Sequence, residues 1–408
     1  MKREKLSFSV KAAVAVAALG YFVDVFDILL FSVVRTASLK DLGVPAERLM
    51  DSGVFLINAQ MAGMLLGGIL WGIWGDKRGR MSVLFGSILL YSLANIANGF
   101  AVTVNQYAVL RFLAGLGLAG ELGAGVTLVA EILPTAWRGI GTTIIATVGV
   151  AGGLTASLVG GAWPWRTAYF IAGGMGLLLL CLRVSVSESG LFRAMAHDPS
   201  VARGDLRLVL HSPQRVLRYL RCLFIGVPIY FVLGIYVTFA PEFGAARGLG
   251  TAFTAADAVF YSYIGFILGD LASGLLSQWL RSRRQALVAF ISLSFVACCL
   301  FLFAPGLTLG GAKALYVLMG FSAGHWAVMI TVSAEQFGTN LRSTVATTIP
   351  NFVRGMVIPM TTALQWLKPE LGVVSASFWI LAVVSVLALG AAFQLKESFS
   401  TDLDYLEK

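Results

Sequence analysis

The chain has 408 residues, of which 58% are hydrophobic and only 12% are charged. This composition excludes an ordinary soluble domain, in which about a quarter of the residues are charged, and indicates a polytopic membrane protein. The formal net charge of +9 does not predict nucleic-acid binding, because Lys and Arg gather in the segments on one side of the apolar runs, as the positive-inside rule describes.

The apolar runs predict about twelve membrane-spanning helices, because each crossing needs about 20 apolar residues. The first run follows a short basic segment and lacks a small-residue cleavage site, so we expect an uncleaved span and not a signal peptide. Both termini are then expected in the cytoplasm, in a plasma (bacterial inner) membrane protein. The predicted limits are 10–34, 53–75, 81–103, 106–133, 139–161, 164–184, 219–241, 254–279, 285–304, 313–337, 342–366 and 372–395.

The longest connection between runs divides the chain. It predicts an N-terminal six-helix half over 1–184, a cytoplasmic central loop over 185–217 and a C-terminal six-helix half over 218–408. The halves repeat each other, since AEILPTAWRGIGTTI begins at residue 130 and AEQFGTNLRSTVATTI begins at residue 334, an offset of 204. Internal repeats of this kind are typical of transporters whose binding site lies between two halves near the membrane midplane.

Two acidic residues lie inside the first run. Asp24 and Asp27 are three residues apart, so they share one face of the predicted helix. A carboxylate at the centre of a span costs about 2.5–3.5 kcal/mol on insertion scales. We therefore expect both side chains to face a polar cavity and to serve the function of the protein.

The connection after the second run carries a recognisable motif. GGILWGIWGDKRGR, residues 67–80, resembles the G-x-x-x-D-[RK]-x-G-R signature of the major facilitator superfamily. The resemblance covers the whole chain, from the repeat to the central loop. It implies an all-α membrane protein with 12 transmembrane helices in two pseudo-symmetric six-helix halves, which transports by alternating access.

The resemblance also implies charged latches on the cytoplasmic face. Charges at helix ends pair when that face closes and are hydrated when it opens, which makes the interface bistable. The alternative is that these charges only orient the chain in the membrane. The implied latch residues are Asp76, Arg80, Glu131, Arg138, Glu335 and Arg342.

Finer similarities concern proton coupling. DVFD (24–27) is similar to an element of aromatic-acid and metabolite proton symporters, and RFLAGLGLAGE (111–121) to a pattern of proton-coupled porters. Arg111 matches Asp27 in depth from the same side, so we expect an Asp27–Arg111 pair, and the related porters imply that it couples protons. The alternative is a permanent buried ion pair. Asp24 is then a second proton site or a substrate contact.

A carboxylate and an imidazole occupy equivalent positions in the two halves. Glu121 in the fourth run and His325 in the tenth are separated by the repeat offset of 204. Imidazole titrates near neutral pH, which makes His325 a candidate for pH-sensitive substrate binding. The alternative is that it packs between helices through hydrogen bonds.

Arg354 carries the prediction about substrate class. It lies 12 residues after Arg342, or about 18 Å along a helix, which places it near the midplane. Arginine stays protonated and therefore needs an anion. The spacing also resembles that of organic anion transporters, in which such an arginine takes the substrate carboxylate. We expect a cavity that also contains Asn351, Tyr230 and Tyr236.

These observations predict proton-coupled symport of a small organic anion, a carboxylate, by a functional monomer in the lipid bilayer. One alternative for Arg354 is an ion pair with Glu121 or Asp270 that holds the halves together. An alternative function is transport of an organic cation or neutral metabolite, with Asp24, Glu121 and Asp270 as ligands. A sensor that binds without transport is a third. The sequence contains no nucleophile–base pair, metal-ligand spacing or phosphate loop, so we expect no enzyme, cofactor or metal site.

Overall fold

The computed structural model describes residues 8–78, 80–121, 135–187, 211–250 and 252–399. Its elements in these ranges are all helical. Eight helices in this part are long and apolar enough to cross a membrane. The prediction of an all-α, multi-pass membrane protein is confirmed, and the number of twelve spans stays a prediction. Most of the predicted central loop lies outside the described residues.

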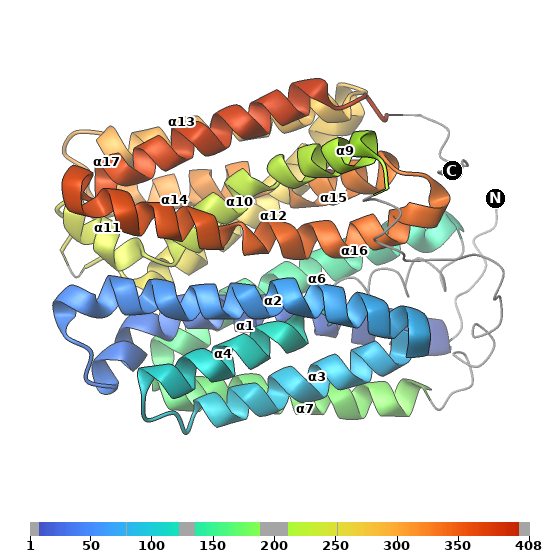
Figure 1. The fold of residues 1–408 in the computed structure, drawn as a ribbon, viewed down its shortest axis with the longest axis horizontal. Coiled ribbons are helices and arrows are strands. Elements are labelled where there is room, and N and C mark those ends of the chain that lie inside the picture. Colours follow the sequence, from blue (N-terminus) through green and yellow to red (C-terminus); the bar gives the residue numbers. More distant parts are fainter. Residues whose placement is uncertain (1–7, 79, 122–134, 188–210, 251, 400–408) are drawn as a thin grey trace.

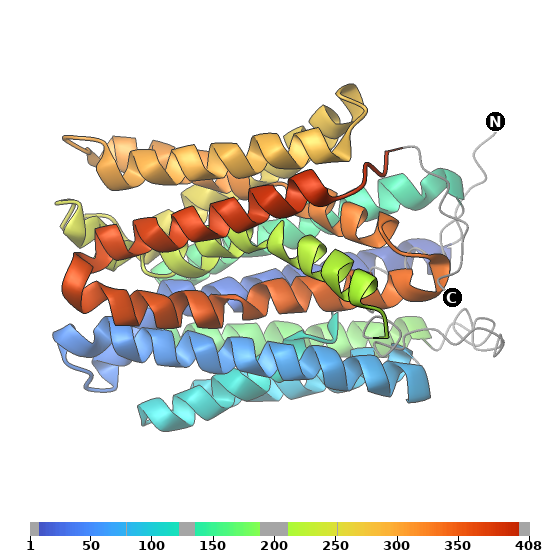
Figure 2. The same ribbon diagram turned by 45° about the horizontal axis from the view of Figure 1, so that its top comes forward.

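The long helices lie side by side along one axis (Figures 1 and 2). The first group, called here the N-terminal group, comprises α1 Phe8–Asp41, α2 Leu49–Arg78, α3 Arg80–Asn98, α4 Val104–Leu118, α6 Thr135–Ala162 and α7 Trp165–Ser187. The second, the C-terminal group, comprises α9 Pro213–Phe224, α10 Val227–Phe231, α11 Ala240–Ala246, α12 Ala255–Trp279, α13 Arg283–Phe303, α14 Leu309–Ala323, α15 Trp326–Glu335, α16 Thr339–Gly355 and α17 Val357–Gln394.

The two groups meet through four helix pairs. α2 packs against α16 and α17, while α1 and α6 pack against α12. We call the end of the bundle where α1 begins and α17 ends the terminal end, and the end where α1 gives way to α2 the far end (Figure 1). Because α1, α12 and α16 all lie at the junction, side chains from both groups meet there.

Three predicted spans are interrupted in the structure. The seventh is divided into α9, α10 and a π-helical segment, Val232–Val237, and Pro228 opens α10. The tenth breaks at His325, between α14 and α15. The eleventh breaks at Met356, between α16 and α17, and α17 continues into the twelfth across Gly372, where φ is +72° and the helical geometry is broken. Periodicity does not show such breaks, because the residues on both sides of them are equally apolar.

The π-helical segment leaves backbone carbonyls that side chains satisfy. The hydroxyl of Thr238 donates to the carbonyl oxygen of Leu233 at 3.0 Å, and the hydroxyl of Tyr316 donates to that of Tyr236 at 2.8 Å. A π turn is rare and frequently lies at a functional site. Here it directly follows α10, whose Tyr230 lines a cavity.

Close backbone contact joins α12 to α14. A Cβ atom added to Gly265 would lie 1.9 Å from the carbonyl oxygen of Val317, and one added to Gly320 would lie 1.9 Å from that of Ser262. Small residues at such positions let membrane helices approach closely enough for their backbones to pack. The absence of side chains therefore sets the distance between these two helices.

Replacing Gly265 with alanine should force α12 and α14 apart and lower stability by about 1–3 kcal/mol. Gly274 of the same helix is the matched control, because nothing lies within 4 Å of a Cβ placed there. Gly274→Ala should be neutral or slightly stabilising, since alanine favours the helix. Thermal unfolding of both variants in detergent measures the difference, and equal melting temperatures would contradict the packing argument.

Candidate functional site

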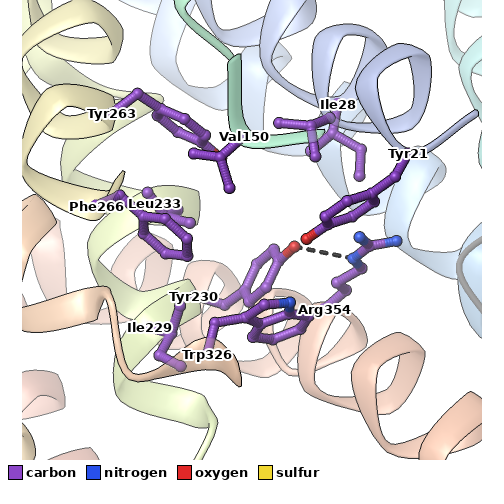
Figure 3. A pocket seen from close by; sticks show the side chains of 11 residues that line it. Tyr21, Ile28, Val150, Ile229, Tyr230, Leu233, Tyr263, Phe266, Trp326 and Arg354 are labelled. Carbon is purple, nitrogen blue, oxygen red and sulfur yellow. Dashed lines mark hydrogen bonds between the residues drawn. The ribbon is translucent and has the colours of Figure 1, made fainter. Parts of the chain in front are cut away.

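A small cavity lies between the two groups, bounded by α1, α6, α10, α12, α15 and α16. Its volume is about 20 Å³, room for about one water molecule. Figure 3 shows the hydroxyls of Tyr21 and Tyr230 pointing toward Arg354, with Trp326 beside Tyr230. Tyr230 and Trp326 are in ring contact, with centroids 5.7 Å apart. The cavity therefore combines aromatic walls with one cation. The aromatic residues around it are Tyr21, Tyr230, Tyr263, Phe266 and Trp326.

Arg354 is 2% exposed and extends from α16 into this cavity. Its Nε donates to the Tyr230 hydroxyl at 2.9 Å, and its Nη2 donates to Oδ2 of Asp24 at 3.0 Å. Its Nη1 has no hydrogen-bond partner among the described residues. The arginine does pair across the two groups, but with Asp24 and not with Glu121 or Asp270, the partners considered from the sequence. Asp270 instead accepts a hydrogen bond from the backbone N–H of Ala327 at the start of α15.

The expected Asp27–Arg111 pair is present. Nη1 of Arg111 lies 3.5 Å from Oδ1 of Asp27, and both side chains are fully buried. The same nitrogen donates to Asn95 at 3.2 Å, and the guanidinium lies over the ring of Tyr169. Neither charge lines the cavity. All four residues belong to the N-terminal group, and the role of the pair in proton coupling stays a prediction.

Glu121 has a partner that the sequence did not suggest. Its two carboxylate oxygens accept hydrogen bonds from Nη1 and Nη2 of Arg183 at 3.1 and 2.8 Å, and Ser87 donates a third bond at 2.9 Å. Arg183 lies near the end of α7, and a cation near the end of an apolar run is normally interpreted as a charge that orients the chain in the membrane. Glu121 does not line the cavity, and its role as a substrate ligand stays a prediction.

The remaining predicted ligands lie outside the cavity lining. His325 occupies the break before α15, with its ring nitrogens 2.8 and 3.3 Å from the carbonyl oxygens of Ser322 and Ile225. Asn351 donates to the carbonyl oxygen of Ala119 at 3.1 Å and so links α16 to the end of α4. Tyr236 is buried in the C-terminal group. Of the predicted ligands, the structure brings Arg354 and Tyr230 together in the cavity.

One predicted latch residue can be placed. Glu335 pairs with Arg283 at 3.3 Å and accepts a hydrogen bond from Ser398 at 2.6 Å, all within the C-terminal group at its terminal end. Nearby, partial burial raises the pKa of Glu397, but hydrogen bonds from Ser282 and the α13 backbone outweigh this and hold that pKa below its usual value. Glu131 and the side chains of Asp76, Arg80, Arg138 and Arg342 lie outside the described part of the chain.

At the far end, Arg35 joins the two groups. The sequence analysis does not predict this contact. It is fully buried, its Nη2 lies 2.6 Å from Oε2 of Glu242, and its Nε donates to the carbonyl oxygen of Thr238. Nη1 donates to the carbonyl oxygen of Leu49. The predicted apolar run ended at residue 34, whereas α1 continues to Asp41. The predicted limit therefore leaves Arg35 just outside the first span.

Comparison with known proteins adds a family context. The sequence family described as the Major Facilitator Superfamily matches residues 17–362. The niacin transporter NiaP of Acinetobacter baylyi is 26% identical, over 80% of each chain. The gentisate transporter of Corynebacterium glutamicum is 24% identical, over 95% of this chain and 89% of its own. The crystal structure of a D-xylose–proton symporter aligns with a TM-score of 0.70 at 15% identity, over 96% of this chain and 99% of that one, and so shows the same fold.

Proposed function

The chain belongs to the major facilitator superfamily. From this we propose that it transports a small organic anion, a carboxylate, in symport with protons by alternating access. Members of this family are integral multi-pass membrane transporters and not enzymes. The finer architecture is part of the proposal. It comprises twelve spans in two six-helix halves, 1–184 and 218–408, with a cytoplasmic loop between them and both termini in the cytoplasm.

The observation that supports an anionic substrate best is the buried Arg354. A guanidinium is always charged and binds a carboxylate through two parallel N–H···O bonds. Its Nη1 has no hydrogen-bond partner among the described residues, and the arginine lines a cavity whose other walls are largely aromatic. A site with one cation and aromatic sides suits a planar aromatic acid. Niacin and gentisate, named for two relatives, are both aromatic carboxylic acids.

The cavity must enlarge for such a substrate to bind. At about 20 Å³ it holds roughly one water molecule, far less than an aromatic ring requires. Because its walls come from both groups, a change in the separation of α1 and α16 alters its size. Alternating access supplies such a movement.

Transport of a cation has less support. The three candidate acidic ligands are each engaged, Asp24 by Arg354, Glu121 by Arg183 and Asp270 by the N–H of Ala327. A cationic substrate would also meet the positive charge of Arg354 in the same cavity. We therefore propose no second function.

The test is uptake of radiolabelled nicotinate and gentisate by liposomes that contain the purified protein. With the lumen alkaline, we expect the acids to accumulate above equilibrium and a protonophore to abolish the accumulation. Nicotinamide, which has the same ring without the carboxylate, is the matched substrate control and should not accumulate. Protein-free liposomes measure passive entry of the weak acids. Uptake of nicotinamide or choline in preference to every acid, or indifference to the gradient, would refute the proposal.

A further inference from the structure

Arg354 of α16, which lines the cavity, forms an ion pair between the two groups with Asp24 of α1, whose side chain lies outside the cavity lining (Figure 3 shows Arg354). One contact of 3.0 Å joins the side chains, which are 0% and 2% exposed. Oδ1 of Asp24 and Nη1 of Arg354 have no hydrogen-bond partner among the described residues. The pair thus engages one of the two carboxylate oxygens and one of the two Nη nitrogens. It is weaker than the bidentate fork that these two side chains can form.

A substrate carboxylate would compete with Asp24 for the same nitrogen. A bidentate fork needs two adjacent N–H donors of the guanidinium. Nε already donates to the hydroxyl of Tyr230, so the available donors are Nη1 and Nη2. Nη2 is the nitrogen that holds Asp24. Nη2 carries two N–H groups, so a substrate in this fork would place a second carboxylate on the nitrogen that holds Asp24. Two like charges at this distance repel each other, which favours separation of Asp24 from Arg354.

The charges around Asp24 do not compensate for this separation. Glu121 is held by Arg183, and Asp27 by Arg111, so each of these pairs is neutral without the substrate. Adding a carboxylate to the Asp24–Arg354 pair would leave one excess negative charge in a buried site, which is costly. The titratable groups that interact with Asp24 are Arg354, Glu121, Asp27, Tyr21, Tyr91, Tyr230 and Tyr263.

We propose that Asp24 is the proton acceptor of coupled transport, and that the substrate carboxylate causes protonation by displacing Asp24 from Arg354. One anion and one proton enter together, and the site remains neutral as an arginine–substrate pair beside a protonated aspartic acid. When the substrate leaves, Asp24 releases the proton and returns to Arg354. This inference rests on the proposed function. It transfers the coupling role from Asp27 to Asp24, because Asp24 contacts Arg354, which lines the cavity, whereas Asp27 contacts Arg111, which does not.

The test compares Asp24→Asn with Asp27→Asn, which removes the neighbouring carboxylate of the same helix. The affinity for nicotinate is measured between pH 6 and 8 on the full-length protein in detergent. If binding takes up one proton, Kd should rise about tenfold per pH unit wherever free Asp24 is ionised. Asp24→Asn should bind with a Kd that varies less than about twofold across this range, because asparagine cannot be protonated. Asp27→Asn should keep the wild-type slope.

Transport gives a second readout. In liposomes, Asp24→Asn should still exchange internal for external nicotinate, but should lose accumulation driven by the pH gradient. Accumulation by Asp24→Asn, or loss of the pH slope in Asp27→Asn alone, would overturn the inference. A wild-type protein that binds nicotinate without any pH slope would overturn it while leaving anion transport intact. A wild-type protein that neither binds nor transports any acid would refute both.

The proposal remains testable if Asp24→Asn does not fold. Calorimetric titration of the wild-type protein with nicotinate, in two buffers of different ionisation enthalpy, counts the protons taken up per substrate bound. We expect a value close to one at a pH where Asp24 is ionised. A value of zero across pH 6–8 would contradict the exchange without any variant.

Discussion

Arg354→Ala is expected to reduce carboxylate uptake by about two orders of magnitude or more. Removing one partner of a buried, hydrogen-bonded charge pair costs about 3–5 kcal/mol, and each 1.4 kcal/mol is about tenfold in affinity. Arg354→Lys should be intermediate, since lysine keeps the charge but cannot form the planar fork. The measurement is the initial rate of nicotinate uptake as a function of its concentration, normalised to folded protein.

Lys368→Ala is the matched control for this series. Lys368 also forms an ion pair between the two groups, with Asp51, but both side chains are partly exposed. Exposed pairs of this kind contribute about 0–1 kcal/mol, so uptake should remain near that of the wild type. A folded Arg354→Ala variant with the wild-type KM for nicotinate would show that this arginine is structural.

Arg183→Ala is expected to lower stability by about 3–5 kcal/mol, because it leaves the carboxylate of Glu121 buried without its partner. The double variant Glu121→Gln/Arg183→Met should recover most of this loss, since it removes both charges together and keeps similar volumes. Thermal unfolding in detergent measures the three proteins. Equal destabilisation by the single and the double change would contradict the coupling of the two side chains.

Uptake by this double variant also decides the role of Glu121. If the pair is structural, the double variant, with its stability restored, should transport nicotinate with a KM close to that of the wild type. If Glu121 binds the substrate, as its position in the repeat suggested, transport should stay lost although the protein is folded. The two outcomes separate a ligand from a residue that stabilises the N-terminal group.

The sequence predicts the all-α, multi-pass class, but it misses the breaks inside three spans and predicts only part of the site. Asp27 and Arg111 could be paired because both lie within apolar runs and at similar depth. The partner of Arg354 could not be found in this way, because contact between α1 and α16 depends on how the two groups are rotated and shifted against each other. Depth along a helix does not contain that information.

Charges near the ends of apolar runs were the other source of error. Arg35 and Arg183 lie within one residue of predicted limits, where a cation is normally assigned an orienting role. In the structure both are buried and paired with a glutamate. The aromatic residues Tyr21 and Trp326 were also missed, because an aromatic side chain inside an apolar run gives no signal of which way it points.

The π-helical segment after Tyr230 has a consequence for how relatives of this chain diverge. Successive residues of a helix are separated by about 100° around its axis, and the wider turn over 232–237 accommodates more residues than a regular one. Loss of one residue from this turn would rotate Tyr230 relative to Tyr236 and present a different side chain to Arg354. The number of residues in one turn can therefore change the substrate preference, even where the cavity-lining residues keep their identities.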